Sequence, residues 1–216
     1  MRKLLKALTF TGVSALSMMV MPVQAGTILF QDNFDADYGT SSLNFNSFAN
    51  WNVDDGTVDY IRAPNVWSID NCVGGCIDID GSTGNGGRMS SKTNFNLLAS
   101  NTYRISVDVS GNQRTDSLEN LTIGLSSLIS FSFNAIAAGD IFSTYSGMFS
   151  GFAGLSSLFL ETQSNDNVGA VLDNVMLECV SCQPTSSVPE PGVFGLLALG
   201  LAGLGVMRKR DTSVSI

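Results

Sequence analysis

The side chains able to do chemistry in this sequence are mainly carboxylates and two pairs of cysteines, because the 216 residues include no histidine. Histidine is the usual general base of nucleophilic catalytic triads and a common zinc ligand. Catalytic arrangements of the Ser-His-Asp and Cys-His types are therefore excluded, and the most common zinc ligand is missing.

The four cysteines lie in two close pairs, Cys72 with Cys76 and Cys179 with Cys182. An even number of cysteines in an exported chain is typical of disulfides. Of the three possible pairings we favour the two local ones. The alternative is a four-cysteine zinc site, which the C-x3-C and C-x2-C spacings permit but an oxidising compartment disfavours.

Carboxylates dominate the charge of the segment 26–188, which holds 17 Asp or Glu against five Lys or Arg, a net charge of −12. Such a segment lacks the basic surface that nucleic acids require, so we expect no nucleic-acid partner. Divalent cations, in contrast, would be attracted to it.

Paired carboxylates also suffice for glycoside hydrolysis, but no spacing here singles out an acid and a nucleophile. Asp54 and Asp55 are adjacent, so in a strand they would point to opposite faces. We therefore predict that the protein is not an enzyme, with a hydrolase of matrix glycans as an alternative.

One short acidic motif, Asp78-x-Asp80-Gly81, matches the beginning of an EF-hand calcium loop. That loop requires a Glu at its twelfth position, and position 89 holds Met. We favour the edge of a strand that enters a glycine turn.

Aromatic side chains can stack on the apolar faces of sugar rings, which is a common basis of sugar binding by β-sandwich modules. Trp67 follows a Pro-Asn pair in an expected loop and is our best candidate for carbohydrate binding, with Arg62 as its polar neighbour. Large aromatic residues more often belong to the core, and we assign Trp51 there. The wider set of candidates is Trp51, Tyr60, Trp67, Tyr103 and Tyr145, with Arg62, Asn65 and Arg114 nearby.

The elements that position these residues are predicted to be β-strands. Apolar residues at 103, 105, 107 and 109 alternate with polar ones, the period of a half-buried strand. Similar alternation occurs at 77–80, 121–125, 129–133 and 171–177. In the last segment we expect Val171, Val175 and Leu177 to share one face with Asp173.

Clusters of Gly, Asn, Asp and Ser separate these runs, as at 81–87. No stretch between the two ends of the chain shows a sustained helical period. The pattern predicts an all-β fold, a single β-sandwich or jelly roll.

The first 25 residues are typical of a secretory signal peptide. A basic start precedes an apolar run over 7–20, and the segment closes with the small-x-small sequence Val23-Gln24-Ala25. We predict cleavage after Ala25 and export of the chain. An uncleaved membrane anchor is the alternative.

The C-terminal end has three parts after a polar linker over 183–188. The triplet Pro189, Glu190 and Pro191 cannot be helical, because proline lacks the amide hydrogen and restricts the residue before it. An apolar run over 192–207 would span about 24 Å as a helix, less than the ~30 Å of a hydrocarbon core. The basic stop that follows favours a cytoplasmic C-terminus and consists of Arg208, Lys209 and Arg210.

In this order, at the end of the chain, the three parts resemble the PEP-CTERM sorting signal. The resemblance implies recognition by an exosortase, a membrane cysteine protease-transpeptidase, with processing near Pro189-Glu190-Pro191. It also implies a Gram-negative host that produces exopolysaccharide, and a transient stay in the inner membrane. A plain single-pass tail anchor is the alternative.

The central segment is similar to a galactose-binding-like jelly roll, an architecture shared by many carbohydrate-binding modules. The similarity lies in 32–35 (DNFD), in 79–81 (IDG) with 111–114 (GNQR), and in 171–175 (VLDNV). In many such proteins the first and last strands share a structural calcium ion. The resemblance therefore implies calcium at Asp35 and Asp173, with Asp32 and backbone carbonyls as further ligands. If no metal binds, these Asp residues cap turns.

Together these features divide the chain into a signal peptide (1–25), a β-sandwich domain (26–182), a linker (183–188) and a sorting signal (189–210) with a membrane helix (192–207). We predict an exosortase-sorted surface or matrix protein whose sandwich is a non-catalytic, carbohydrate-associated module linked to exopolysaccharide and biofilm. A purely structural or adhesive matrix protein without a sugar site is the alternative.

Overall fold

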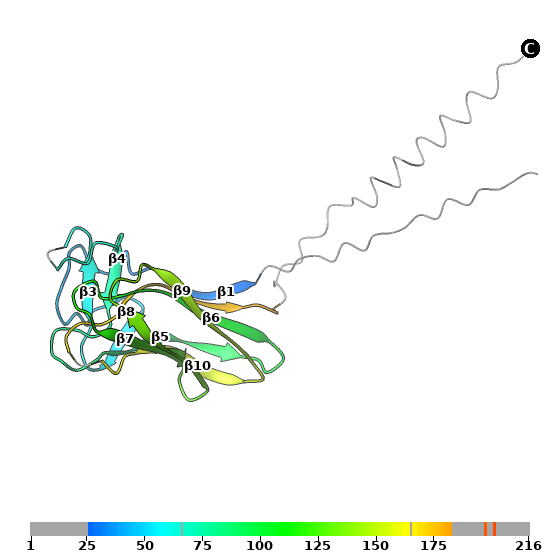
Figure 1. The fold of residues 1–216 in the computed structure, drawn as a ribbon. Coiled ribbons are helices and arrows are strands. Elements are labelled where there is room, and N and C mark those ends of the chain that lie inside the picture. The colour runs from blue at the N-terminus through cyan, green and yellow to red at the C-terminus, as the bar shows by residue number, and fades with distance from the viewer. Residues whose placement is uncertain (1–25, 66, 165, 183–196, 198–200, 202–216) are drawn as a thin grey trace, which may run out of the picture.

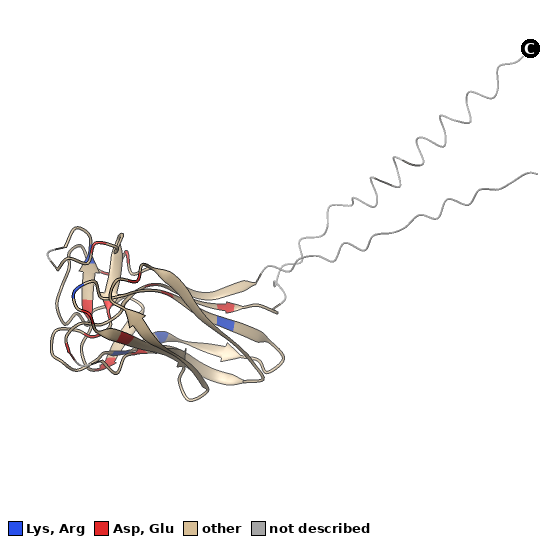
Figure 2. Ribbon diagram, viewed as in Figure 1, with Lys and Arg blue, Asp and Glu red and all other residues tan. Residues whose placement is uncertain are grey.

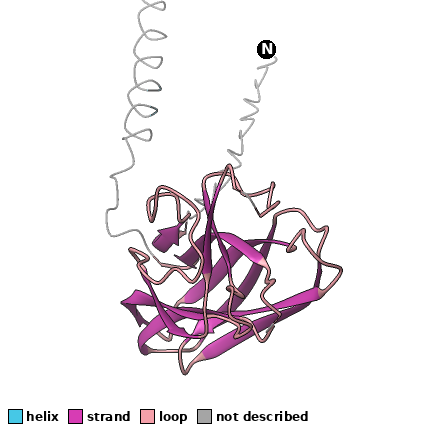
Figure 3. Cartoon of the chain, turned by 90° about the vertical axis from the view of Figure 1, so that its left-hand side faces the viewer, coloured by secondary structure: helices cyan, strands magenta, loops and turns pink. Residues whose placement is uncertain are grey.

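A computed structural model describes residues 26–65, 67–164, 166–182, 197 and 201. Within these residues eleven strands form two antiparallel sheets that face each other (Figures 1 and 3). The predicted signal peptide, the linker and nearly all of the sorting signal lie outside the described residues. The predicted all-β sandwich is confirmed.

The first sheet has the order β3-β4-β11-β6-β9, and β1 also pairs with β11. The beginning of β11 pairs with β4 and its second half with β1, while β6 runs along its other side. The strands of this sheet are β1 (Thr27–Asp32), β3 (Asp59–Arg62), β4 (Gly75–Asp78), β6 (Thr102–Ser110), β9 (Ser143–Ser150) and β11 (Val171–Cys179).

The second sheet has the order β2-β5-β10-β7-β8. The sequence alternations at 103–109, 121–125 and 129–133 fall in β6, β7 and β8, as predicted. The strands of this sheet are β2 (Trp51–Asp55), β5 (Arg88–Leu97), β7 (Leu118–Leu125), β8 (Ile129–Ala137) and β10 (Gly154–Glu161).

The main core fills the space between the sheets with the inward residues of both. Trp51 is completely buried in it, as predicted, and its Nε1–H donates to Oδ2 of Asp32 over 2.9 Å. Tyr60 and Tyr103 are buried as well, so three of the five aromatic candidates for sugar binding are core residues. Each large side chain buried in this way contributes roughly 1.5–3 kcal/mol of hydrophobic stabilisation.

A smaller apolar cluster covers part of the outer face of the first sheet. The connection between β3 and β4 folds back over this face, and Trp67 and Phe142 pack against the cluster from outside. The buried members of this cluster, called the outer cluster below, are Ile61, Ile69, Cys72, Cys76 and Val171.

The cysteines form the two local disulfides that the sequence favoured. Cys72–Cys76 lies in the outer cluster, and Cys179–Cys182 closes the end of β11. All four sulfurs are used in this way, which leaves none of them as a thiolate for a zinc site.

One expectation for β11 is wrong. Val171 belongs to the outer cluster, whereas Leu172, Val175 and Leu177 belong to the main core. The register of β11 against β6 shifts after Asp173, where Asn174 has a positive φ of 49°. This β-bulge reverses which alternate residues face inward, so Val171 and Asp173 lie on the outer face.

The two ends of the domain lie side by side, because Thr27 at the start of β1 pairs with Cys179 at the end of β11. β3 and β4, with the loop that joins them, lie at the opposite end in Figure 1. Figure 2 shows that acidic segments gather at that remote end.

Candidate functional site

The pairing of β11 with two short neighbours brings Asp173 against the first turn of the domain. Asp173 and Asn174 lie where β4 ends and β1 begins alongside β11. The chain leaves β1 after Asp32 and turns at Phe34, whose φ is +55°. The segment after the first strand therefore meets the middle of the last strand.

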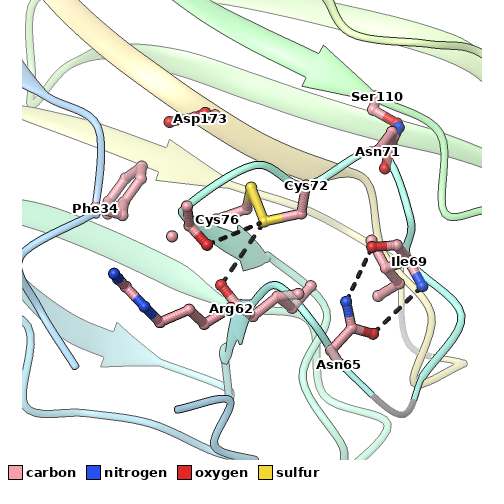
Figure 4. The surroundings of a disulfide bond; sticks show 12 residues. Phe34, Arg62, Asn65, Ile69, Asn71, Cys72, Cys76, Ser110 and Asp173 are labelled. Atoms are coloured by element: carbon pink, nitrogen blue, oxygen red, sulfur yellow. Dashed lines mark hydrogen bonds between the residues drawn. A yellow bond between two sulfur atoms is a disulfide. The ribbon is translucent and has the colours of Figure 1, made fainter. Parts of the chain in front are cut away.

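Asp35 is held on this turn by the disulfide loop below it. Its Oδ1 accepts the backbone N–H of Gly75 over 2.7 Å, and its Oδ2 accepts the side-chain amide of Asn33 over 2.7 Å. The carboxylate lies directly over Gly74, where any Cβ would collide with it. Figure 4 shows the Cys72–Cys76 disulfide that closes this loop, together with Phe34 and Asp173.

Asp173 lies in a strongly acidic environment. Its pKa is raised to about 7, chiefly because burial disfavours the charged carboxylate. The backbone N–H of Asn174, which donates to Oδ1 over 2.6 Å, opposes this shift. The negative charges of Asp35, Asp108 and Asp32 add to it. A bound cation would offset this repulsion.

Asp32 and Asp108 are already engaged by hydrogen-bond donors. Besides Trp51, Asp32 accepts the backbone N–H of Phe34 over 3.0 Å. Asp108 accepts the hydroxyl of Thr144 over 2.6 Å. Sequence reasoning missed Asp108 because only the pairing of β6 with β11 brings it opposite Asp173.

The acidic group formed by Asp32, Asp35, Asp108 and Asp173 offers the oxygen ligands that calcium prefers, but not a complete set. Calcium takes six to eight oxygens. In the part of the chain that the structure describes, no three Asp, Glu, Cys or His side chains are close enough together to hold a metal ion. A calcium ion at Asp35 and Asp173 would therefore depend on backbone carbonyls and water for the rest of its shell.

The two predicted carbohydrate-binding residues, Trp67 and Arg62, line one pocket of about 340 Å³. It lies between the connection that follows β3 and the segment 39–41. Its lining includes Thr40, Ser41, Arg62, Pro64, Asn65 and Trp67. An indole, hydroxyls, an amide and a guanidinium are thus gathered around one space.

Asn65 fixes the position of Trp67. Its Oδ1 accepts the backbone N–H of Trp67 over 3.0 Å, and its Nδ2 donates to the carbonyl of Ile69 over 3.0 Å (Figure 4). The indole also packs against the outer cluster. Trp67 therefore combines a structural contact with a partly exposed position in the pocket.

Arg62 connects this pocket to the acidic group. Its Nη1 donates to the backbone oxygen of Asp35 over 2.6 Å and to the hydroxyl of Tyr60 over 3.2 Å. Its backbone N–H donates to Oγ of Ser41 over 2.8 Å. Order in the turn that carries Asp35 is thereby linked to the shape of the pocket.

The remaining sequence candidates lie elsewhere. Tyr145 packs edge-on against Phe133, and Arg114 forms an ion pair with the buried Asp78. Asp78 also accepts the backbone N–H of Asp80 over 3.1 Å. The Asp78-x-Asp80 motif is thus occupied with backbone contacts at the end of β4, as expected for a strand that enters a turn.

A family model described as the PEP-CTERM protein-sorting motif matches residues 187–210. The predicted sorting triplet and basic stop fall inside this range, so the sorting signal is confirmed. Among the residues that the structure describes, no helix has the length and apolar character needed to cross a membrane.

Several solved structures share the fold at low identity. One is the CBM22-1 and GH10 modules of an endo-1,4-β-D-xylanase from Clostridium thermocellum, with 13% identity, a TM-score of 0.46, and coverage of 76% of this chain and 30% of that one. Another is a CBM22-1 xylan-binding domain from Paenibacillus barcinonensis, with 18% identity, a TM-score of 0.41, and coverage of 75% and 100%.

A third is the C-terminal CBM6 of a laminarinase from Zobellia galactanivorans, with 15% identity, a TM-score of 0.41, and coverage of 68% and 97%. The chain spans 30% of the length of each of the first two structures found. No curated protein matches the sequence.

Proposed function

We propose that this protein is an exosortase-sorted surface or extracellular-matrix component of a Gram-negative bacterium, whose β-sandwich associates with exopolysaccharide without catalysing a reaction. The observation that carries the proposal is the PEP-CTERM sorting motif at 187–210. The domain lies N-terminal to this signal, so it is the part that sorting would deliver.

The two ends of the chain supply the proposed route. The signal peptide over 1–25 directs export, and the apolar run over 192–207 holds the chain in the inner membrane while Arg208, Lys209 and Arg210 stay on the cytoplasmic side. An exosortase then cuts near Pro189-Glu190-Pro191. The two prolines keep this triplet out of a helix and therefore accessible.

The placement of the Trp67 pocket supports a role in binding after sorting. The domain begins and ends at one end of the sandwich, where Thr27 pairs with Cys179. The connection that carries Trp67 lies at the other end (Figure 1). A glycan could therefore reach the pocket while the chain is attached through its C-terminus.

The composition of the pocket supports a sugar as the ligand. The partly exposed indole of Trp67 offers an apolar surface for the C–H face of a sugar ring. Hydroxyl and amide groups of Thr40, Ser41 and Asn65 are suited to hydrogen bonds with sugar hydroxyls.

Calcium at Asp35 and Asp173 is the proposed cofactor, in a structural role. The support is the acidic environment of Asp173, which a divalent cation would neutralise. Calcium bound there would join the first strand's turn to the last strand and, through Arg62, steady the pocket.

The native host provides the test of the sorting proposal. Mass analysis of the finished protein should give a chain that begins near Gly26 and ends near the Pro189-Glu190-Pro191 triplet. Finding residues 192–207 still attached to the extracellular product would overturn exosortase processing. For the glycan part, the host's exopolysaccharide should be retained by the immobilised protein. A protein that retains none would instead be a structural or adhesive matrix component.

A further inference from the structure

A second hollow lies on the outer face of the second sheet, far along the chain from the Trp67 pocket. Phe159 on β10 is paired with Gly124 on β7, which in turn is paired with Ser130 on β8. Because Gly124 has no side chain, the outer face is interrupted between Phe159 and Ser130. The resulting pocket has a volume of about 480 Å³.

The floor of this hollow is aromatic. Phe159 lies outside the main core, although its neighbours Leu158 and Leu160 belong to it. A Cβ at Gly124 would lie only 2.8 Å from Cε1 of Phe159, so the ring edge reaches into the space that the glycine leaves open. Any larger residue at 124 would fill the hollow.

A charged pair forms one wall. The guanidinium of Arg88 lies 4.4 Å from the centroid of the Phe159 ring and forms an ion pair with Glu161. An arginine carries five N–H donors, so a guanidinium that pairs through Nη1 can also donate to a ligand. Cation–π contact and ion pairing hold the group in place before a ligand arrives.

The opposite wall is the turn between β7 and β8, which supplies Ser127, Leu128 and Ile129. Hydrogen bonds to the neighbouring β10 strand fix this turn. Oγ of Ser126 lies 3.1 Å from Oγ of Ser157, and the backbone oxygen of Ser126 accepts the hydroxyl of Ser156 over 2.8 Å. A hydroxyl and two aliphatic side chains therefore face the charged pair from a constrained position.

We infer that this hollow, formed by Arg88, Phe159, Gly124 and the 127–130 turn, binds a neutral sugar unit of a polysaccharide. The charge of Arg88 is balanced by Glu161, so the hollow does not select an anion. An aromatic and aliphatic floor suits the C–H face of a pyranose ring, and the guanidinium with Ser127 and Ser130 suits its hydroxyls.

The inference rests on the glycan part of the proposed function but not on the Trp67 pocket. That pocket belongs to the first sheet and this hollow to the second. A protein with a sugar site on each sheet can hold two polysaccharide strands at once, which gives avidity without a new contact. The inference therefore adds cross-linking of a matrix to its association with one.

The test is calorimetric titration of the exported chain, tail included, in a detergent without sugar groups. The probes are neutral tetrasaccharides of glucose, xylose, galactose and mannose, with tetragalacturonate as the acidic probe. We expect at least one neutral probe to bind, and Arg88→Met to weaken it about tenfold, the loss of one charged hydrogen bond. Methionine retains an apolar cover over Phe159.

The matched control is Arg104→Met. Arg104 and Glu178 form the corresponding cross-strand ion pair on the first sheet, so this variant should bind as the unmodified chain does. Ser130→Tyr places a ring into the hollow from an exposed position and should abolish binding there while the chain stays folded. Trp67→Ala should leave this site unchanged.

Three results would overturn the inference: no neutral probe binds, tetragalacturonate alone binds, or Arg88→Met and Ser130→Tyr bind the neutral probe as tightly as Arg104→Met. Loss of neutral-sugar binding only in Trp67→Ala would also overturn it, yet would leave the proposed glycan association standing. The two proposals are thus separated by which variant loses binding.

Discussion

Asp173 on β11 and Asp108 on β6 lie directly opposite each other in the first sheet. Like charges in this position destabilise a sheet, and here Asp35 adds a third negative charge to the environment of Asp173. Asp108 is compensated by hydroxyl and amide donors from Thr144 and Asn174. Asp173 is therefore the carboxylate at which a cation would have the largest effect.

Calcium should stabilise the domain through this residue. At a hundredfold excess over its dissociation constant, a ligand specific for the folded state adds about 2.7 kcal/mol to the free energy of unfolding. For a domain of this size that corresponds to a rise of about 5 to 10 °C in Tm. Thermal unfolding in calcium and in a chelator measures the difference.

Asp173→Asn should remove most of that rise. Glu161→Gln on the other sheet is the control and should keep it. An identical Tm in calcium and chelator for the unmodified chain would rule out a calcium ion at Asp35 and Asp173.

The pH dependence of the calcium-free domain should carry the signature of Asp173. Its pKa is raised from 3.8 to about 7 in the folded state, so the folded state holds the proton more tightly than the unfolded state. The resulting stabilisation is fully present below about pH 4 and is lost as the pH rises through about 7. In chelator, the unmodified chain should lose more stability between pH 5 and pH 8 than Asp173→Asn loses, as measured by urea unfolding. Equal losses would contradict this assignment.

Trp67→Ala should weaken retention of the host exopolysaccharide about tenfold, which is the loss of about 1.4 kcal/mol. Phe142→Ala is a close control, because Phe142 packs against the same outer cluster but does not line the pocket. Both variants remove an aromatic ring from that cluster, so a difference between them reports on the pocket. Affinity electrophoresis measures both, and equal affinities would exclude Trp67 as a contact.

The two disulfides should differ in their effect on the pocket. Each closes a short loop, and removal of one should cost about 2 kcal/mol of unfolding free energy. Replacing Cys72 and Cys76 by Ser should also weaken glycan binding, because this disulfide lies in the cluster on which Trp67 packs. Replacing Cys179 and Cys182 should lower stability and spare binding. Equal binding by the two double variants would show that the pocket does not depend on the disulfide loop.

Processing should depend on the proline-flanked triplet. Changing Pro189 and Pro191 to Ala allows a helix to continue through Glu190, and the tail should then stay attached in the native host. Pro184→Ala, in the linker, should be processed normally. Immunoblotting of membrane and extracellular fractions distinguishes the two, and normal release of the double variant would contradict the role of the triplet.

The sequence alone was sufficient for the features that depend on local pattern. The alternation at 103–109 has the two-residue period of a strand, and the structure places β6 there. The order of triplet, apolar run and basic stop identified the sorting signal, because each part is contiguous. The two disulfides were favoured for the same reason, since each pair is separated by only two or three residues.

The tertiary structure decided what depends on contacts distant in sequence. The bulge at Asn174 moved Val171 out of the main core, and no periodic pattern contains the bulge, because a single residue in a left-handed conformation resets the alternation. Asp108 joined Asp173, and Gly124 opened a hollow beside Phe159, only through pairing between strands. Strand pairing is a property of the whole sheet, so residues that share a face can be named only when the register is known.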